Sequence, residues 1–230
     1  MGAIASAVAA PYPAGEGAAG EAAMVERGQR ALGDIAVHSR LADGTAVCLR
    51  TITPGDAPLL RQGIATLSAE ARYLRFFSPA PALPEPVIAR LVDVDGHDHI
   101  AWGALCTECE GTPAIGAVHA VRARPDGPVG EYSVAVLDDF QGLGLARMMT
   151  AALLIQCRAE GLGTLEVHML TENAAAKRLV KALGAEWTGA SAGVADYRID
   201  VAAALAALRA DTEAQGVQDV FAALGGGTGG

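Results

Sequence analysis

The sequence predicts an α/β domain in which antiparallel strands come first and a β-α-β unit follows. Apolar residues alternate over several short segments up to residue 137, which is typical of strands. After Gly142 the apolar spacing becomes that of a helix, and a further strand and helix follow. The chain has 230 residues, 51% of them hydrophobic and 19% charged, which is enough for one buried core.

The first element predicted is a hairpin. Residues 35–41 and 45–52 flank the pair Asp43-Gly44, a dipeptide that tolerates the positive φ of a tight turn. A helix is then expected after Thr53, whose hydroxyl suits an N-cap and which is followed by proline at the first helical position. Its expected buried side consists of Leu59, Leu60, Ile64 and Leu67.

The middle of the chain predicts short helices and then strands. The helices are expected near residues 69–76 and 84–92. Strands are expected over 99–106, 114–121 and 129–137, with Gly- and Pro-containing turns between them. Short connections of this kind favour antiparallel pairing.

The second half predicts the β-α-β unit. A long helix begins after Gly142 and ends before residue 161, and a strand follows over 164–170. A second helix is expected over 173–183, and strands near 185–188 and 194–200 complete the core.

The two ends differ in composition from the middle. Residues 1–33 are rich in Ala, Gly, Pro and Glu, which predicts a disordered tail or linker. The folded domain is expected over 34–212, and 213–230 is expected to be an extension with a flexible glycine-rich end. We expect a chain of residues 34–212 to keep its stability and its binding. The start fits both a weak signal peptide and a myristoylation pattern at Gly2, and we treat both as chance matches.

Charge and hydropathy exclude some classes of function. The net charge of −9 argues against binding to nucleic-acid backbones, which calls for a basic face. No run of apolar residues has the roughly 20 that a membrane span needs, and a cytoplasmic protein is expected. Its four cysteines are expected to be free buried thiols without disulfides. Cys106 and Cys109 form a C-x-x-C, but a zinc site would need a second pair.

The segment EYSVAVLDDFQGLGLARMM, residues 131–149, carries the clearest chemical signal. Gly142 and Gly144 leave backbone N–H groups open to an anion at the start of a helix, where the helix dipole adds positive potential. Arg147, one turn into the helix, adds a possible charged contact. A dinucleotide fingerprint would need a small residue where Arg147 stands, so an NAD site is disfavoured.

These motifs resemble those of the GNAT superfamily of N-acetyltransferases. Residues 141–146, QGLGLA, match the superfamily's pattern Q/R-x-x-G-x-G/A. Residues 171–187, TENAAAKRLVKALGAEW, resemble its second signature, an Asn-led helix that ends in a Leu-Gly-Ala turn. The likeness covers about residues 47–200 and extends to bacterial protein lysine acetyltransferases, which share features such as SAEARYLRFFSP at 68–79. It implies a GNAT fold: a mixed, mainly antiparallel twisted sheet with helices on both faces. The sheet would be splayed between its fourth and fifth strands, here 129–137 and 164–170.

The resemblance also implies acetyl-CoA as co-substrate and no metal. The pantetheine arm of acetyl-CoA would lie along the strand at 129–137, and the pyrophosphate of acetyl-CoA would lie over the glycine loop. The residues implied for acetyl-CoA binding are Val134, Ala135, Val136, Gln141, Gly142, Leu143, Gly144, Leu145, Ala146, Arg147, Asn173 and Lys177.

For catalysis, Glu131 resembles the glutamate general base of GNAT lysine acetyltransferases. A backbone N–H freed by a bulge near residues 134–136 would polarise the thioester carbonyl. Val180 stands where many relatives have a tyrosine acid, so the thiolate is expected to take its proton from solvent. Tyr132 and Tyr197 are alternatives, although packing roles are expected for both.

Other polar residues suggest less. Asp93, Asp95, His97, Asp98 and His99 have the composition of a metal site but lie in a short turn. His119 and His168 alternate with apolar residues, and are expected to be satisfied or exposed rather than catalytic.

The acceptor remains open between three alternatives. A protein lysine is favoured, a small-molecule amine would use the same acetyl-CoA half of the site, and a non-catalytic acyl-CoA sensor would not need the missing tyrosine. The oligomeric state is not predicted.

Overall fold

One eight-stranded sheet forms the centre of the computed structural model, which describes residues 35–78 and 80–225. Its strand order is β1-β2-β3-β4-β5-β6-β8-β7, and only β5 and β6 are parallel neighbours. The strands are β1 Val37–Arg40, β2 Ala46–Thr51, β3 His99–Cys106, β4 Ala114–Arg122, β5 Val129–Val136, β6 Thr164–Leu170, β7 Glu186–Ser191 and β8 Val194–Asp200. The predicted α/β class and each predicted strand are therefore confirmed.

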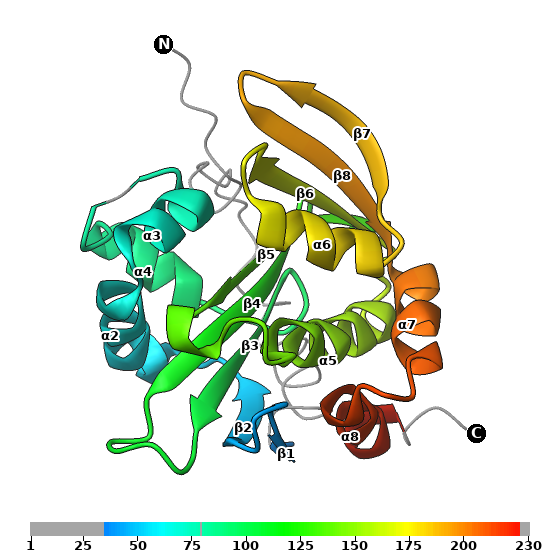
Figure 1. Cartoon of the computed structure of the whole chain (residues 1–230). Helices are drawn as coiled ribbons and strands as arrows, with labels where there is room; N and C mark the ends of the chain where they lie inside the picture. The colour runs from blue at the N-terminus through cyan, green and yellow to red at the C-terminus, as the bar shows by residue number, and fades with distance from the viewer. Residues whose placement is uncertain (1–34, 79, 226–230) are drawn as a thin grey trace, which may run out of the picture.

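Helices cover both faces of this sheet, as Figure 1 shows. On one face, α2 to α4 pack against the sheet through small apolar clusters, and α5 packs on the other face in the main core. The helices are η1 Pro54–Asp56, α2 Ala57–Thr66, α3 Ala69–Phe76, α4 Glu85–Val92, η2 Asp138–Phe140, α5 Leu145–Ala159, α6 Ala174–Ala182, α7 Val201–Ala210 and α8 Gln215–Leu224. No described helix is long and apolar enough to span a membrane.

Alternation along the strands decides which helix each side chain meets. On β3, Trp102 is fully buried in the α5 core, and its Nε1 donates to Gln156 Oε1 at 2.8 Å. Its neighbour Ala101 belongs to the cluster with Ile52 and Val92 on the other face. Because successive side chains of a strand point to opposite faces, one sheet supports two separate apolar layers.

The predicted helix start at Thr53 is confirmed and includes a capping box. The Thr53 backbone N–H and hydroxyl both donate to Asp56 Oδ2, at 2.8 and 2.9 Å. Arg50 on β2 donates to both carboxylate oxygens, at 2.5 and 2.8 Å. Hydrogen bonds from Arg50 lower the pKa of Asp56 to about 2, while burial opposes the shift and Thr53 supports it.

Replacing Asp56 by Asn is therefore expected to lower the free energy of unfolding at pH 7 by on the order of 2 kcal/mol. A depressed carboxyl pKa stabilises the fold above the unfolded value, which is 3.8, and this stability is lost as the pH falls through about 2. The difference between wild type and Asp56→Asn should therefore shrink in acid. Urea unfolding at pH 7 and in acid measures it. Glu108→Gln, in an exposed pair with Arg40, is the control expected to change little.

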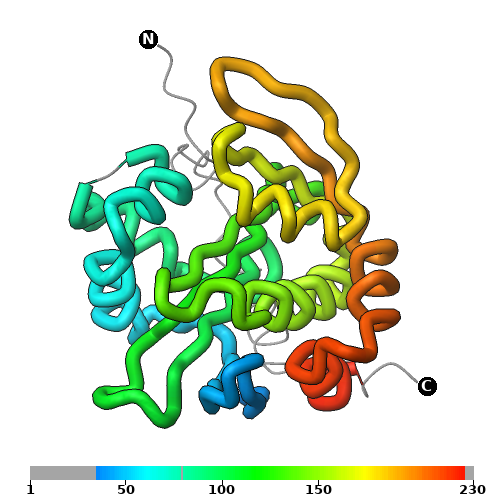
Figure 2. Tube along the Cα trace, in the orientation of Figure 1, coloured from blue at the N-terminus to red at the C-terminus, as the bar shows by residue number. Residues whose placement is uncertain are grey.

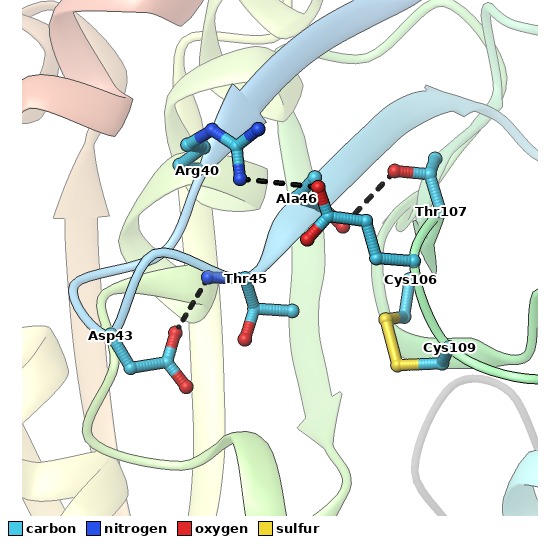
Figure 3. The surroundings of a disulfide bond; sticks show 8 residues. Arg40, Asp43, Thr45, Ala46, Cys106, Thr107 and Cys109 are labelled. Atoms are coloured by element: carbon cyan, nitrogen blue, oxygen red, sulfur yellow. Dashed lines mark hydrogen bonds and ion pairs between the residues drawn. A yellow bond between two sulfur atoms is a disulfide. The ribbon is translucent and has the colours of Figure 1, made fainter.

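The cysteine expectation was wrong for one pair. Cys106 at the end of β3 and Cys109 in the following turn form a disulfide, with their Cα atoms 5.4 Å apart (Figure 3). The turn brings the two residues within bonding distance, a local effect that the argument from cellular compartment did not consider. Beside them, the Thr107 hydroxyl donates to the Ala46 carbonyl oxygen at 3.2 Å. Cys48 and Cys157 are free and buried, as expected.

Two C-terminal helices, α7 and α8, were not predicted. Figure 2 shows α8 beside the blue β1–β2 hairpin, so that the two ends of the described chain meet. The Ser39 hydroxyl on β1 donates to Asp219 Oδ2 on α8 at 2.6 Å, and Val217, Val220 and Phe221 lie in the main core. This packing disagrees with the expectation that residues after 212 are dispensable for stability. The expected tail, the pattern at Gly2 and the glycines after 225 lie outside the described residues.

Candidate active site

A cavity of about 570 Å³ opens where β5 and β6 stop pairing. Their parallel register covers Val129 to Glu131 against Thr164 to Glu166, and both strands continue beyond it. Residues of β5, β6, α3, α5, α6 and the η2–α5 loop line the cavity. Ten of the twelve residues implied for acetyl-CoA, and Glu131, lie on its wall: Val134, Ala135, Val136, Gln141, Gly142, Gly144, Leu145, Ala146, Arg147 and Asn173.

The glycine loop leads into α5 with the backbone that its sequence demands. Gly142 and Gly144 have φ values of +76° and +91°, in the left-handed region that favours glycine. A Cβ at either position would meet no atom within 4 Å, so space lies above the loop. Leu145 and Ala146 follow as the first residues of α5, and N–H groups in this position have no partner within a helix. The loop therefore has the backbone geometry that suits an anion.

The edge of β5 beside the cavity offers further backbone groups. On the other edge, Leu137 N–H donates to Ile115 C=O, and Ala123 N–H donates to Val129 C=O. Odd-numbered residues of β5 thus face β4, and Val134 and Val136 direct their backbone groups toward the cavity. The expected bulge is absent, because the β4–β5 register is regular from residue 130 to 136. The groups face the cavity because the pairing with β6 ends.

Glu131, Ser133 and Ala135 share the face of β5 turned toward α3. Arg75 of α3 reaches this face and donates to Ser133 Oγ at 2.7 Å. Burial lowers the pKa of the Arg75 guanidinium to about 10, while Glu131 and Tyr132 act against the shift. Arg75 therefore carries its charge at neutral pH. Of the described residues that line the cavity, Glu131 is the acidic one, and it lies within the influence of this cation.

The segment 68–77 holds α3 in place as one wall of the cavity. Ser68 caps α3 by accepting from Ala71 N–H, and its own hydroxyl donates to Asp138 Oδ1 at 2.8 Å. Arg72 donates to the Leu67 carbonyl at the end of α2. The segment thus connects α2, α3 and the loop that precedes Gly142.

The second signature forms the wall at α6. Asn173 is the N-cap of α6 and accepts from Ala176 N–H at 2.9 Å. Lys177 does not line the cavity, because its Nζ donates to the Thr171 carbonyl outside it. Arg178, one residue later, does line it. The implied role of Lys177 is therefore not supported by the geometry, and Leu143 likewise lies outside the lining.

Arg147 lies on the cavity wall one turn into α5. One of its terminal nitrogens pairs with Asp211 at 2.5 Å, at the end of α7. Among the described residues, Arg147 Nε is a buried side-chain nitrogen with no hydrogen-bond partner. Because such groups are usually satisfied, an anionic ligand is a reasonable partner for it.

The tyrosine alternatives have structural roles. Tyr132 is buried, and its hydroxyl lies 2.7 Å from Thr150 Oγ1 on α5. Burial raises the pKa of Tyr132 well above its usual range, which makes it a poor acid at neutral pH. Tyr197 packs in the main core, and Val180 is buried on the cavity wall.

The remaining polar residues bind one another. Asp95 accepts from the backbone N–H of His97 and His99, and His99 Nε2 lies 3.0 Å from the buried His119 Nδ1. Within residues 35–78 and 80–225, no group of three or more His, Cys, Asp or Glu could hold a metal ion. His168 differs, because it pairs with Asp196 at 2.7 Å and lines the cavity.

Sequence reasoning missed Arg75, Ser133, His168 and Arg178. Strand alternation from Glu131 would have placed Ser133 on the same face. Helical spacing would have grouped Ala175, Arg178, Leu179 and Ala182 on one side of α6 and left out Lys177. Arg75 lay in a segment already noted for its resemblance, but the pairing of α3 with β5 is a tertiary contact that no local pattern contains.

Comparisons with known proteins agree with this architecture. The family model described as an acetyltransferase (GNAT) domain matches residues 46–186. Among curated proteins, the acetyltransferase Pat of Mycolicibacterium smegmatis is 32% identical over 156 residues, which is 66% of this chain and 45% of Pat. The acetyltransferase PA5475 of Pseudomonas aeruginosa is 30% identical over 152 residues, covering 66% of this chain and 81% of that protein.

Among solved structures, the GNAT domain of S. lividans PAT has a similar fold. The TM-score is 0.65 at 24% identity, covering 72% of this chain and 96% of that one. The chain spans less than half the length of Pat. The matched model covers more than half of the chain, and the chain belongs to the GNAT acetyltransferase family.

Proposed function

We propose that this acetyltransferase transfers the acetyl group of acetyl-CoA to a lysine side chain of a protein, with Glu131 as general base. The observation that carries the proposal is that Glu131 and the anion-binding loop before α5 line the same cavity. Acetyl-CoA as the donor follows from the family.

The residues of the cavity fit acetyl-CoA. The open space over Gly142 and Gly144, with the first N–H groups of α5, suits a pyrophosphate. The unpartnered Arg147 Nε and the Arg178 guanidinium on the wall add positive charge. Val134 and Val136 offer backbone groups at the edge of β5, where the amides of the pantetheine arm would pair as an added strand.

Backbone groups also serve the reacting carbonyl. An N–H at the cavity edge of β5, from Val134 or Val136, would donate to the thioester oxygen as negative charge develops on it. Such a donor is fixed in place by the β4–β5 ladder and needs no rearrangement during the reaction.

Glu131 addresses the hardest step, which is the loss of a proton from the amine. An unperturbed lysine has a pKa of about 10.4, so almost all of it is an ammonium ion at neutral pH. The Glu131 carboxylate would take this proton directly or through water. Arg75 places a positive charge near that carboxylate.

Two observations support a protein lysine as acceptor. The sequence of 68–79 carries the resemblance to bacterial protein lysine acetyltransferases, and its residues Ala71, Leu74, Arg75 and Phe77 line the cavity. Pat is among the similar proteins. A panel of lysine-bearing proteins, spermidine and an aminoglycoside, incubated with labelled acetyl-CoA, tests the choice. Label on protein lysines is expected. Label on small amines alone would replace the acceptor, and binding without transfer would favour a sensor, a reading that Val180 in place of tyrosine allows.

Replacing Gly144 by Val is expected to weaken acetyl-CoA binding by a few kcal/mol, because a branched side chain would occupy the space above the loop. The change also strains the backbone, since φ is +91°. Gly44→Val is the matched control, because Gly44 has the same φ with nothing within 4 Å and lies in the β1–β2 turn outside the cavity. Calorimetry measures both affinities. Equal binding by the folded Gly144 variant and the control would place the pyrophosphate elsewhere.

A further inference from the structure

His168 and Asp196 form a polar pair at the point where the cavity opens. His168 lies on β6 two residues after Glu166, the last residue of β6 paired with β5, so it is the first position on that face beyond the pairing. Asp196 lies directly opposite on β8, and its Oδ1 is 2.7 Å from His168 Nδ1. Both side chains are about one-third exposed, at 36% and 34%.

The pair shares a sheet face with Glu131. In the parallel β5–β6 register Glu131 is the partner of Glu166, so these two side chains lie on one face. His168 is two residues further along β6 and lies on that face as well. The odd-numbered residues of β6, Leu165, Val167 and Met169, are buried in the main core on the other face. Glu131 and His168 thus reach the cavity from neighbouring strands, with α3 packed beside both.

Asp196 fixes which nitrogen of neutral His168 is free. A carboxylate only accepts hydrogen bonds, so Nδ1 carries the proton and Nε2 keeps a lone pair. A base oriented by a carboxylate in this way recurs in enzymes that activate nucleophiles.

The proposed reaction contains a second proton transfer, to which no residue has yet been assigned. A lysine ammonium has three N–H bonds and the amide product has one, so two protons leave the nitrogen. Glu131 takes the first. The second leaves as the C–N bond forms and the C–S bond breaks, while the electron pair of that bond goes to sulfur, which needs a proton. Val180 stands where many relatives have the tyrosine that supplies it.

We propose that His168, held by Asp196, is a catalytic residue that takes the second proton from the acceptor nitrogen at Nε2 and gives it to the leaving sulfur. The imidazole ends each cycle in the protonation state in which it began, and CoA leaves as the thiol. The proton held by Glu131 returns to solvent, so that one proton is released per acetyl transferred. This inference rests on the proposed function.

Three variants test it. His168→Ala removes the imidazole, and Asp196→Asn removes the carboxylate that orients it. Glu166→Gln is the control: Glu166 lies on the same strand and face, pairs with Arg198 on β8 at 3.8 Å, and does not line the cavity. Steady-state rates are measured with labelled acetyl-CoA and the amine of the panel above that is acetylated fastest, with and without added imidazole.

In His168→Ala, kcat is expected to fall about a hundredfold, with acetyl-CoA affinity unchanged. Imidazole from solution should restore part of the rate, because His168 faces an open cavity. In Asp196→Asn, kcat should fall about tenfold or more, and imidazole should not restore it. The kcat of Glu166→Gln should match that of wild type. If kcat of His168→Ala falls, imidazole does not restore it and the KM for the amine changes, His168 only shapes the acceptor site. If kcat of His168→Ala equals that of wild type, the proposal is overturned.

The measurement also separates this inference from the general base. Glu131→Gln is assayed beside the other variants. If Glu131→Gln is impaired and His168→Ala is not, the role of Glu131 as general base is kept and the proposed role of His168 is wrong. If His168→Ala is impaired and rescued while Glu131→Gln is not impaired, the assignment of the base fails instead. If no amine of the panel is acetylated, the proposed function fails and this inference fails with it.

Discussion

Replacing Glu131 by Gln should lower kcat by about a hundredfold to ten-thousandfold while acetyl-CoA binds as before. Glutamine keeps the size and polarity of the side chain but cannot hold the proton of the acceptor amine. The groups assigned to acetyl-CoA are the α5 loop, the edge of β5 and α6, and the proposal gives the Glu131 carboxylate no part in binding it. Calorimetry of acetyl-CoA and initial rates of acetyl transfer measure the two effects separately.

The pH dependence distinguishes a base from a residue of merely structural importance. As the pH rises, more of the acceptor amine loses its proton unaided, so the residual rate of Glu131→Gln should climb. Wild type should level off at a lower pH than the mutant. A structural defect would instead lower the rate by the same factor at every pH.

Glu166→Gln is the matched control for this experiment as well. Glu166 is the register partner of Glu131 across the parallel β5–β6 pair, but it lies outside the cavity lining. Each of the two variants therefore removes one carboxylate from the β5–β6 pair, but only Glu131→Gln removes it from the cavity wall. If Glu131→Gln and Glu166→Gln both match wild type at pH 7, another base has to be sought.

The sequence predicted the parts of this molecule that depend on local patterns. Alternation and helical spacing placed the strands at 99–106 and 164–170 and the helix at 69–76 with the bounds that the structure has. The glycine loop was predictable because positive φ at Gly142 and Gly144 depends on the residue type itself. The position of Glu131 on β5 was also predictable, from the strand and the motif together.

Features that depend on tertiary contacts were not predicted. Arg75 reaches Ser133 across 58 positions in the sequence, and His168 meets Asp196 only because β8 pairs with β6. The bulge expected near 134–136 came from the resemblance, whereas here the end of the β5–β6 pairing frees the same edge. A family pattern thus predicted that backbone groups would be open to the cavity, but the cause is different.

The C-terminal helices were missed although their pattern was visible. Val217, Val220, Phe221 and Leu224 follow the spacing i, i+3, i+4 and i+7 of an amphipathic helix. The resemblance ended near residue 200, and the alanine- and glycine-rich composition that follows suggested an extension. Composition describes an average, whereas four well-spaced apolar residues are enough to attach a helix to a core.

A chain that ends at residue 212 is therefore expected to lose most of its stability. The four apolar side chains of α8 are at most 8% exposed, and burial of each contributes about 1.5 to 3 kcal/mol. Their sum, an upper value, approaches the whole stability of a typical domain, about 5 to 15 kcal/mol. Removal of α8 would also uncover Met148 of α5, against which Gly216 packs so closely that a Cβ would lie 2.5 Å from the sulfur.

Thermal and urea unfolding of three chains test this expectation. A chain of residues 1–225 keeps α8 and should unfold like the chain of residues 1–230. A chain of residues 1–212 should unfold at a much lower temperature or lack a cooperative transition. Phe221→Ala, which keeps the helix and removes one buried ring that also stacks with Arg209, should lie between them, with a loss of about 3 kcal/mol. Equal stability of the 1–212 and 1–225 chains would mean that α8 adds nothing to the core, and that the domain does end near residue 212.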